Sequence, residues 1–213
     1  MTRSDLTHIY FLLDRSGSMQ SIKSDTEGGF AAFIEEQRRA PGECRVTLAR
    51  FDHQYDVVYA GVPVAEVPPL DLQPRGRTAL LDAMGRLVTD AGAGLAALPE
   101  DDRPGTVIVA VMTDGLENAS VEWTHAAIKS LVEQQSTQYS WQFLYMGADQ
   151  DAIEVGTSLG VDARYAVTYG RGRSREALAG AADKISRLRS ARRANPAAVM
   201  EGYTEAERAR LTD

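Results

Sequence analysis

The sequence has a single cysteine and no long apolar run. Cys44 has no partner for an internal disulfide, and no window reaches the roughly 18 consecutive apolar residues of a membrane-spanning helix. The first residues, MTRSDLTHIYF, lead almost directly into strand-like sequence, without the regions of a secretory signal. We therefore expect a cytoplasmic protein in which Cys44 is a small buried hydrophobic residue and not a catalytic one.

Basic residues are in the minority, and common catalytic motifs are missing. The formal net charge is -7, which argues against a nucleic-acid or anionic-membrane binder, because those surfaces attract clustered Lys and Arg. His8, His53 and His125 are scattered, and there is no G-x-S-x-G, P-loop or G-x-G-x-x-G motif. The basic stretch GRGRSR (170–175) precedes a predicted helix, so we expect a solvated loop there. The charge balance is compatible with a cation site.

The composition is that of one ordinary globular domain: 213 residues, of which 44% are hydrophobic and 25% charged. We expect residues 1–193 to form this domain and residues 194–213 a C-terminal tail with a short helix. Thr204 and Glu207 have the spacing of a capping box for that helix. The sequence leaves open whether the tail docks on the domain or serves as a linker.

Strand-like segments alternate with amphipathic segments along the chain. Strands are predicted at residues 8–13, 45–51, 56–62, 106–113, 141–146 and near 163–168, and helices at 19–39, 79–98, 121–135, 151–159 and 174–193. The turn at 52–55 predicts a hairpin, and the continuous apolar run at 106–113 is typical of a strand buried on both faces. The pattern predicts an α/β fold, Rossmann-like, with three α/β/α layers, a mostly parallel central sheet and one antiparallel edge strand.

Polar side chains gather at the predicted strand ends. Asp14 follows the strand HIYFLL, Ser16 and Ser18 come directly after it, and Asp114 follows the strand TVIVAVMT. Thr78 stands at the junction of a proline-rich loop and a helix. Because open α/β sheets bind ligands beyond the carboxyl ends of their strands, these five side chains are candidates for one site.

Three of these residues also have an ordinary structural explanation. Ser18 and Thr78 are residue types favoured at helix N-caps, and Asp114 before Gly115 suits a turn. Asp149 and Asp151 are predicted near the same edge of the sheet, where the start of a helix accounts for them. Glu117 and Asn118, beside Asp114, either shape the ligand-binding surface or belong to a plain loop.

Three segments resemble the von Willebrand factor A family. DRSGS (14–18) matches the D-x-S-x-S motif of that family, GRTALLDA with Thr78 is similar to its second loop, and VMTDGLEN with Asp114 to its third. The resemblance extends from about residue 6 to residue 160, and the three segments in this order look like a complete metal-ion-dependent adhesion site. The resemblance implies that this protein is a stand-alone, bacterial-type member of the family that acts as an adaptor or scaffold.

The donor atoms at this predicted site are all oxygens. Two aspartates, two serines and one threonine suit a hard cation, Mg²⁺ or Mn²⁺, and the sulfur and imidazole ligands that favour zinc are missing. The resemblance implies that Ser16, Ser18 and, in the active state, Thr78 contact the ion, while Asp14 and Asp114 act largely through water or hydrogen bonds. A Glu or Asp of a protein partner would then complete the coordination.

A metal-dependent phosphohydrolase with Asp14 as its nucleophile is the alternative function. Enzymes that form an aspartyl phosphate usually carry a second acid two residues after the nucleophile, and here Ser16 occupies that position. No lysine lies close to Asp14 or Asp114 in sequence to neutralise a transferred phosphoryl group. We therefore expect a binding module and not an enzyme.

Overall fold

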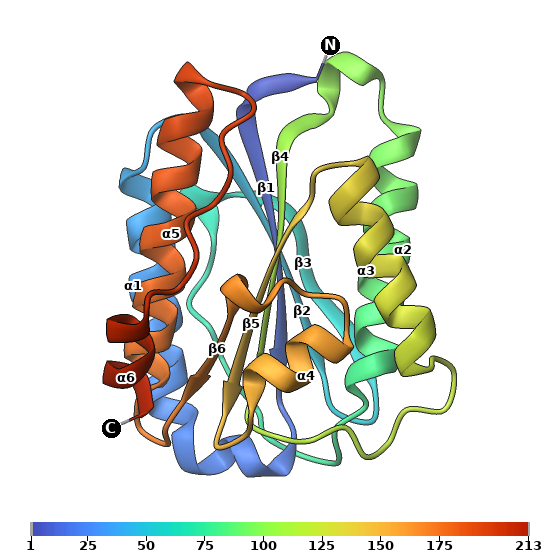
Figure 1. Ribbon diagram of the computed structural model, residues 1–213, viewed down its shortest axis with the longest axis vertical. Helices are drawn as coiled ribbons and strands as arrows, with labels where there is room; N and C mark the ends of the chain where they lie inside the picture. The colour runs from blue at the N-terminus through green and yellow to red at the C-terminus, as the bar shows by residue number, and fades with distance from the viewer. Residues whose placement is uncertain (1, 213) are drawn as a thin grey trace.

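The computed structural model describes residues 2–212 and has one six-stranded sheet with helices on both faces (Figure 1). The strands are β1 Arg3–Asp14, β2 Glu43–Phe51, β3 Tyr55–Pro63, β4 Pro104–Thr113, β5 Gln142–Ala148 and β6 Ala166–Tyr169. The helices are α1 Lys23–Arg39, α2 Leu80–Ala97, α3 His125–Gln138, α4 Ala152–Ser158, α5 Ser174–Ala194 and α6 Glu205–Thr212. Short 3-10 helices lie at Gly17–Ile22, Val64–Glu66, Glu100–Asp102 and Ala163–Tyr165.

The strand order is β3-β2-β1-β4-β5-β6, and only β3 runs antiparallel to its neighbour. This confirms the predicted mostly parallel sheet with one antiparallel edge strand. Asp14 pairs with Phe51 of β2, and Leu13 pairs with Met112 of β4. The carboxyl ends of the three central strands therefore meet at one edge, where their loops converge.

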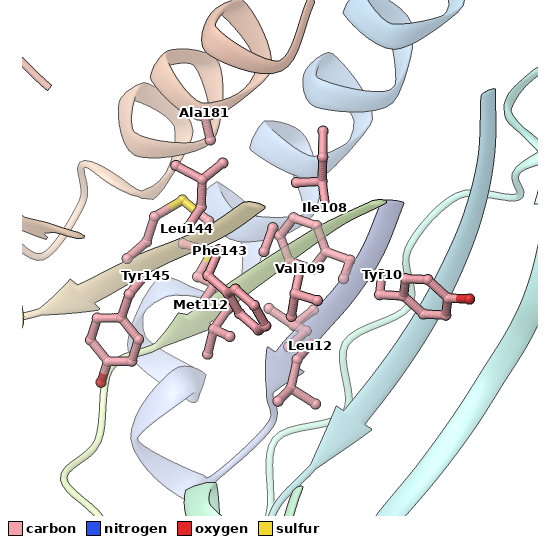
Figure 2. Close-up of a cluster of buried hydrophobic side chains, with 14 of the residues drawn as sticks. Tyr10, Leu12, Ile108, Val109, Met112, Phe143, Leu144, Tyr145 and Ala181 are labelled. Carbon is pink, nitrogen blue, oxygen red and sulfur yellow. The ribbon is translucent and has the colours of Figure 1, made fainter. Parts of the chain in front are cut away.

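Helices α1 and α5 cover one face of the sheet, and α2 and α3 cover the other (Figure 1). Alternate residues of the central strands supply both halves of the core. Ile108 and Leu144 point to the face covered by α1 and α5, whereas Phe143 and Tyr145 point to the opposite face (Figure 2). Because β4 is buried on both sides, its residues are apolar without alternation, as the sequence predicted. Cys44 is a free cysteine and is buried, as predicted.

The predicted helix at 121–135 begins later than expected, at His125. Thr124 caps α3, and its hydroxyl accepts a hydrogen bond from the amide of Ala127. The three preceding residues are held outside the helix by Asp82 of α2, whose carboxylate accepts hydrogen bonds from the amides of residues 121, 122 and 123. A side chain 40 residues away thus sets the start of this helix.

The C-terminal tail packs on α5 and β6. The amide of Gly170 donates to the carbonyl oxygen of Leu211 at 2.8 Å, and the buried Lys184 ammonium binds the Glu207 carboxylate at 2.9 Å. The predicted capping box is present: the amide of Thr204 donates to Glu207 Oε2, and the amide of Glu207 donates to Thr204 Oγ1. The tail is therefore docked. No helix within residues 2–212 is long and apolar enough to cross a bilayer.

Candidate metal site

The first part of the site is the loop after β1, residues 14–18, called loop 1 below. The Asp14 side chain is fully buried. Its Oδ1 accepts a 2.6 Å hydrogen bond from the amide of Ser16, and its Oδ2 accepts a 2.5 Å hydrogen bond from the Thr113 hydroxyl at the end of β4. Both carboxylate oxygens are held in place, so the carboxylate orients loop 1 against β4.

Ser18 connects loop 1 to Asp114. Its hydroxyl donates a 2.6 Å hydrogen bond to Asp114 Oδ1 and lies 3.0 Å from the Ser16 hydroxyl oxygen. Ser18 lies inside the 3-10 helix Gly17–Ile22, and α1 begins only at Lys23, with Ile22 as its N-cap. The alternative role of Ser18 as an N-cap is therefore wrong. Its hydroxyl faces the other candidate residues.

Thr78 reaches the same place from a second loop, residues 75–78, called loop 2 below. The N-cap of α2 is Ala79, so the capping role considered for Thr78 is wrong as well. The Thr78 amide donates to Asn118 Oδ1, and the amide of Asn118 donates to the Thr78 carbonyl oxygen, each at 3.0 Å. A methyl group built on Gly115 would lie 2.7 Å from Thr78 Oγ1 and 3.6 Å from Asp14 Oδ2. The structure thus brings all five predicted side chains together.

The two carboxylates are in an environment that disfavours their charge. Burial, with a smaller contribution from the nearby charge of Asp114, raises the pKa of Asp14 to about 6, although hydrogen bonds from Thr113 and Ser16 act to lower it. Burial also raises the pKa of Asp114, whose Oδ2 is buried without a hydrogen-bond partner within residues 2–212. A buried carboxylate oxygen without a donor is costly, and a cation beside it would offset that cost.

The donor set therefore fits a hard divalent cation. It contains three hydroxyls and two carboxylates, and it has no nitrogen or sulfur. Among the described residues, no three His, Cys, Asp or Glu side chains are grouped as a metal site would require. The candidate site contains only two carboxylates, so it does not form such a group. Its distinguishing feature is the three hydroxyls of Ser16, Ser18 and Thr78.

The other acids of this edge have separate partners. Asp151 caps α4 by accepting hydrogen bonds from two amides, as expected from the helix start, and Asp149 pairs with Arg171 at 2.7 Å. Glu117 accepts hydrogen bonds from the amides of residues 81, 119 and 120. Glu117 and Asn118 are thus not a plain loop: they fasten the loop after β4 to loop 2 and the start of α2.

Sequence reasoning missed Thr113 and Asp82. Thr113 ends an apolar strand and carries no signal except its place directly before Asp114, yet its hydroxyl fixes the Asp14 carboxylate. Asp82 resembles an ordinary acid in the first turn of a helix, a place where acids are favoured anyway. The three histidines lie apart: His8 bonds Thr47 within the sheet, whereas His53 and His125 are exposed.

Comparison with known proteins finds the fold but no sequence family. No protein-family model and no curated protein matches the chain. Among solved structures, proximal thread matrix protein 1 from the mussel byssus is similar with a TM-score of 0.58 at 13% identity, over 86% of this chain and 46% of that one. Another structure of that mussel protein, with a zinc-occupied MIDAS motif, has a TM-score of 0.57 at 13% identity, over 87% and 46%.

Bacterial structures are similar to the same degree. The vWF domain of a type V pili tip protein from Porphyromonas gingivalis has a TM-score of 0.58 at 11% identity, over 84% of this chain and 94% of that one. A von Willebrand factor type A protein from Catenulispora acidiphila has a TM-score of 0.54 at 15% identity, over 84% and 42%. This chain thus spans less than half the length of the mussel and Catenulispora proteins. The chain has the von Willebrand factor A fold.

Proposed function

We propose that this protein is a metal-ion-dependent protein-binding module, an adaptor or scaffold. In this proposal Asp14, Ser16, Ser18, Thr78 and Asp114 hold a Mg²⁺ or Mn²⁺ ion, and a partner's Glu or Asp carboxylate completes its coordination. The observation that carries the proposal is the buried, unpartnered Oδ2 of Asp114, which lies in a cluster whose other candidate donors are also oxygens. When bound, the ion supplies a Lewis-acidic position that a carboxylate can occupy.

The chain's own residues divide the work of holding such an ion. Ser16, Ser18 and Thr78 offer neutral hydroxyl oxygens, which leave the charge of a cation largely uncompensated and so favour an anionic ligand from outside. Asp14 and Asp114 supply the two negative charges. Asp114 Oδ1 accepts from the Ser18 hydroxyl and orients it, and Asp14 Oδ1 accepts from the Ser16 amide and holds the backbone of that residue. In this arrangement the ion attracts a partner's carboxylate because few of the side chains that contact the ion directly are charged.

The surface beside the site is suited to a protein partner. Leu116, two residues after Asp114, is 64% exposed, and Val121 in the same loop is 90% exposed. Large apolar side chains in the open at a binding edge commonly mark an interface, because a partner removes them from water. A protein that contributes a carboxylate would contact this loop at the same time.

The alternative phosphohydrolase receives no comparable support. A nucleophilic carboxylate needs a free oxygen facing the substrate, but both oxygens of Asp14 accept hydrogen bonds and its side chain is fully buried. The position two residues later is Ser16, without a carboxyl group for acid-base chemistry. The geometry of Asp14 suits orientation of a loop better than attack on phosphorus.

Thermal unfolding tests the proposal. Metal-stripped protein is titrated with Mg²⁺, Mn²⁺ and Ca²⁺, with and without glutarate as a model carboxylate, beside the variant Asp14→Asn. A ligand at 100 times its Kd adds about 2.7 kcal/mol to the free energy of unfolding, which shifts the midpoint measurably. We expect Mg²⁺ or Mn²⁺ to raise the midpoint of the parent, more so with glutarate, and not that of the variant. No shift in the parent under any condition would refute the metal site.

A further inference from the structure

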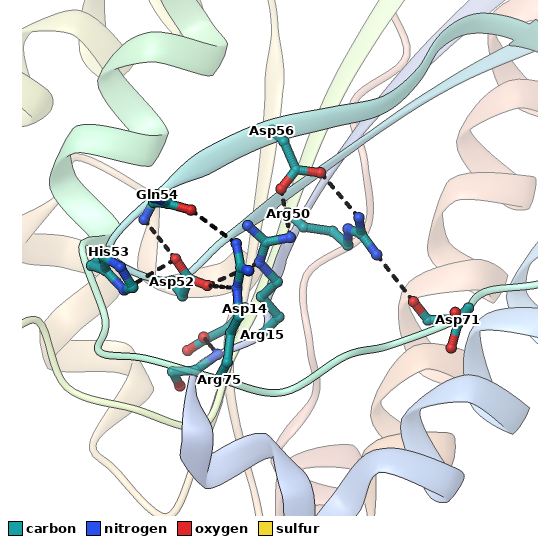
Figure 3. Close-up of polar contacts among 10 residues, drawn as sticks. Asp14, Arg15, Arg50, Asp52, His53, Gln54, Asp56, Asp71 and Arg75 are labelled. Atoms are coloured by element: carbon teal, nitrogen blue, oxygen red, sulfur yellow. Dashed lines mark hydrogen bonds and ion pairs between the residues drawn. The ribbon is translucent and has the colours of Figure 1, made fainter.

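A group of charged side chains, of which Asp52 and Arg15 are buried, lies next to loop 1 and is not part of the metal site. At its centre is Asp52, in the turn between β2 and β3, with its side chain fully buried (Figure 3). Arg15 and Arg75 bind it, and Arg15 is itself only 5% exposed. Buried charges are costly unless paired, so this group is held for a structural or functional reason. We call Arg15, Asp52 and Arg75 the Asp52 clamp.

One oxygen of Asp52 joins the two loops that carry the hydroxyls of the candidate metal site. Asp52 Oδ2 accepts a hydrogen bond from Arg15 Nε at 3.1 Å and from Arg75 Nε at 2.8 Å. Arg15 stands between Asp14 and Ser16 in loop 1, and Arg75 begins loop 2. The other oxygen, Oδ1, accepts from the amide of Gln54 at 2.6 Å, which keeps the carboxylate fixed in its own turn.

Backbone hydrogen bonds continue the same connection. The amide of Arg75 donates to the carbonyl oxygen of Arg15 at 2.7 Å, and the amide of Gly17 donates to that of Gly76 at 3.3 Å. The amide of Ala79 donates to the backbone oxygen of Asp52 at 2.8 Å. Thr78 therefore lies in a short segment whose two sides are both tied to the clamp. The Thr78 backbone cannot move relative to loop 1 unless some of these bonds break.

We propose that Asp52 is a positioning residue for the metal site, which holds loop 2 against loop 1 so that Thr78 is already presented beside Ser16 and Ser18 before an ion binds. This inference rests on the function proposed above. Residues that orient metal ligands without touching the ion commonly change metal affinity by about 10- to 100-fold when they are replaced. With the clamp in place, loop 2 would not have to become ordered when the ion binds.

The test compares Asp52→Asn with a matched control, Arg50→Gln. Arg50 lies beside the clamp and binds Asp56 and the carbonyl oxygen of Asp71 (Figure 3). Arg50 shares Asp56 with Arg15, whose Nη1 lies 2.5 Å from Asp56 Oδ1, but the hydrogen bonds of Arg50 go to Asp56 and Asp71 and not to Asp52. Free Mn²⁺ is measured by electron paramagnetic resonance at a fixed glutarate concentration. We expect Asp52→Asn to weaken Mn²⁺ binding about tenfold or more and the control to leave it within about twofold. If Asp52→Asn does not fold, Arg75→Gln removes the exposed arm of the clamp instead.

A double-mutant cycle separates positioning from a general loss of stability. If Asp52 acts by placing Thr78, then Thr78→Ala weakens Mn²⁺–glutarate binding in the parent but costs much less in the Asp52→Asn background. Additive losses would overturn the inference, because they would mean that Asp52 supports the fold independently of Thr78.

Hydrogen exchange of the metal-free proteins supplies a second readout. The amides of Gly17, Arg75 and Ala79 should exchange faster in Asp52→Asn than in the parent or in Arg50→Gln, because these amides link the two loops. Unchanged Mn²⁺ affinity in Asp52→Asn, with a parent that binds Mn²⁺, would refute only the positioning role. A parent that fails to bind Mn²⁺ even with glutarate would refute the proposed function and this inference together.

Discussion

The hydroxyl of Ser18 donates a 2.6 Å hydrogen bond to Oδ1 of Asp114, from a loop 96 residues away in the chain. Neither residue needs this bond to form its own local structure, since Ser18 lies within a 3-10 helix and Asp114 follows the end of β4. The bond exists because two parallel strands that are neighbours in the sheet end at the same edge. It joins the two ends into one polar site while Asp114 Oδ2 stays without a donor in the described chain.

Removal of the Asp14 charge should stabilise the metal-free protein and abolish its response to metal. Burial raises the pKa of Asp14 to about 6, so at neutral pH the folded protein carries a charge that its surroundings disfavour. One pKa unit corresponds to about 1.4 kcal/mol, which makes this cost up to about 3 kcal/mol. We expect Asp14→Asn to raise the unfolding midpoint of metal-free protein at neutral pH by several degrees, and Mg²⁺ to raise it no further.

The control is Asp149→Asn, which removes an exposed acid from the same edge of the molecule. Asp149 is paired with Arg171 at the surface, where ion pairs contribute little. Its variant should keep both the midpoint and the metal response of the parent. If Asp14→Asn lowered the midpoint of the metal-free protein and kept the response to Mg²⁺, the carboxylate would be a purely structural group.

A methyl group at Gly115 should disturb the site without touching the core. The added carbon of Gly115→Ala would lie 2.7 Å from Thr78 Oγ1, closer than real contacts allow, so the Thr78 hydroxyl must move. We expect Mn²⁺ affinity to fall about tenfold, as for other changes that disturb the orientation of a metal-binding side chain. Electron paramagnetic resonance of free Mn²⁺ measures this loss directly.

Gly94→Ala is the matched control for that change. Gly94 lies in α2, and a methyl group there would meet nothing within 4 Å. An alanine in a helix is favoured over glycine by about 1 kcal/mol, so this variant should be slightly more stable and bind Mn²⁺ like the parent. Equal affinities for Gly115→Ala and Gly94→Ala would show that the Thr78 hydroxyl is not used.

The sheet and the position of the site could be predicted from the sequence because both depend on local signals. Apolar runs indicate the strands, and Asp14, Ser16, Ser18 and Asp114 stand at their carboxyl ends, which a parallel sheet places together. Thr78 was placed by its resemblance to a second loop. The same local reasoning also left helix capping open as an alternative role for Ser18 and Thr78, since a cap and a ligand share the same residue types.

The supporting contacts could not be predicted, because they connect residues that are remote in sequence. Asp52 belongs to a predicted hairpin turn, and nothing near it indicates that Arg15 and Arg75 converge on its carboxylate. The start of α3 is set by Asp82 from another helix. Lys184 in α5 likewise gains its partner only when the tail folds back. Such pairs become visible only in the folded arrangement.

The ion pair between Lys184 and Glu207 should hold the tail in place. The Lys184 side chain is only 4% exposed, so loss of the Glu207 charge leaves a buried positive charge whose other contacts are the Gly202 carbonyl oxygen and the Tyr203 ring. Glu207→Gln keeps the capping box, because glutamine serves there as well as glutamate. We expect the free energy of unfolding to fall by about 1 to 3 kcal/mol, as measured by urea denaturation.

Glu201→Gln is the control in the same tail. Glu201 pairs with Arg187, and both side chains are more than half exposed at 65% and 61%. Its loss should change the free energy of unfolding by no more than about 0.5 kcal/mol. Similar effects of the two substitutions would mean that Lys184 reaches water in the folded protein and that the buried pair contributes no more than a surface one.

His8 should make the protein less stable in mild acid. Burial, together with the nearby charge of Arg45, lowers the pKa of His8 to about 4. The unfolded chain takes up a proton near the ordinary histidine pKa of about 6.5, while the folded protein does so only near pH 4. The unfolded state therefore binds more protons in this window, and the free energy of unfolding falls as the pH is lowered through it.

The variant His8→Gln isolates this contribution, since glutamine can keep the hydrogen bond between His8 Nε2 and the Thr47 hydroxyl but cannot be protonated. Urea denaturation between about pH 7 and about pH 4.5 should show the parent losing up to about 3 kcal/mol more than the variant. His125→Gln, at the exposed start of α3, should follow the parent. Asp14 titrates in the same range with the opposite sign, because its pKa is raised, but it is present in every protein compared and cancels in the difference. Parallel curves for the parent and His8→Gln would mean that His8 is protonated in the folded protein as readily as in the unfolded chain, which its burial beside Arg45 opposes.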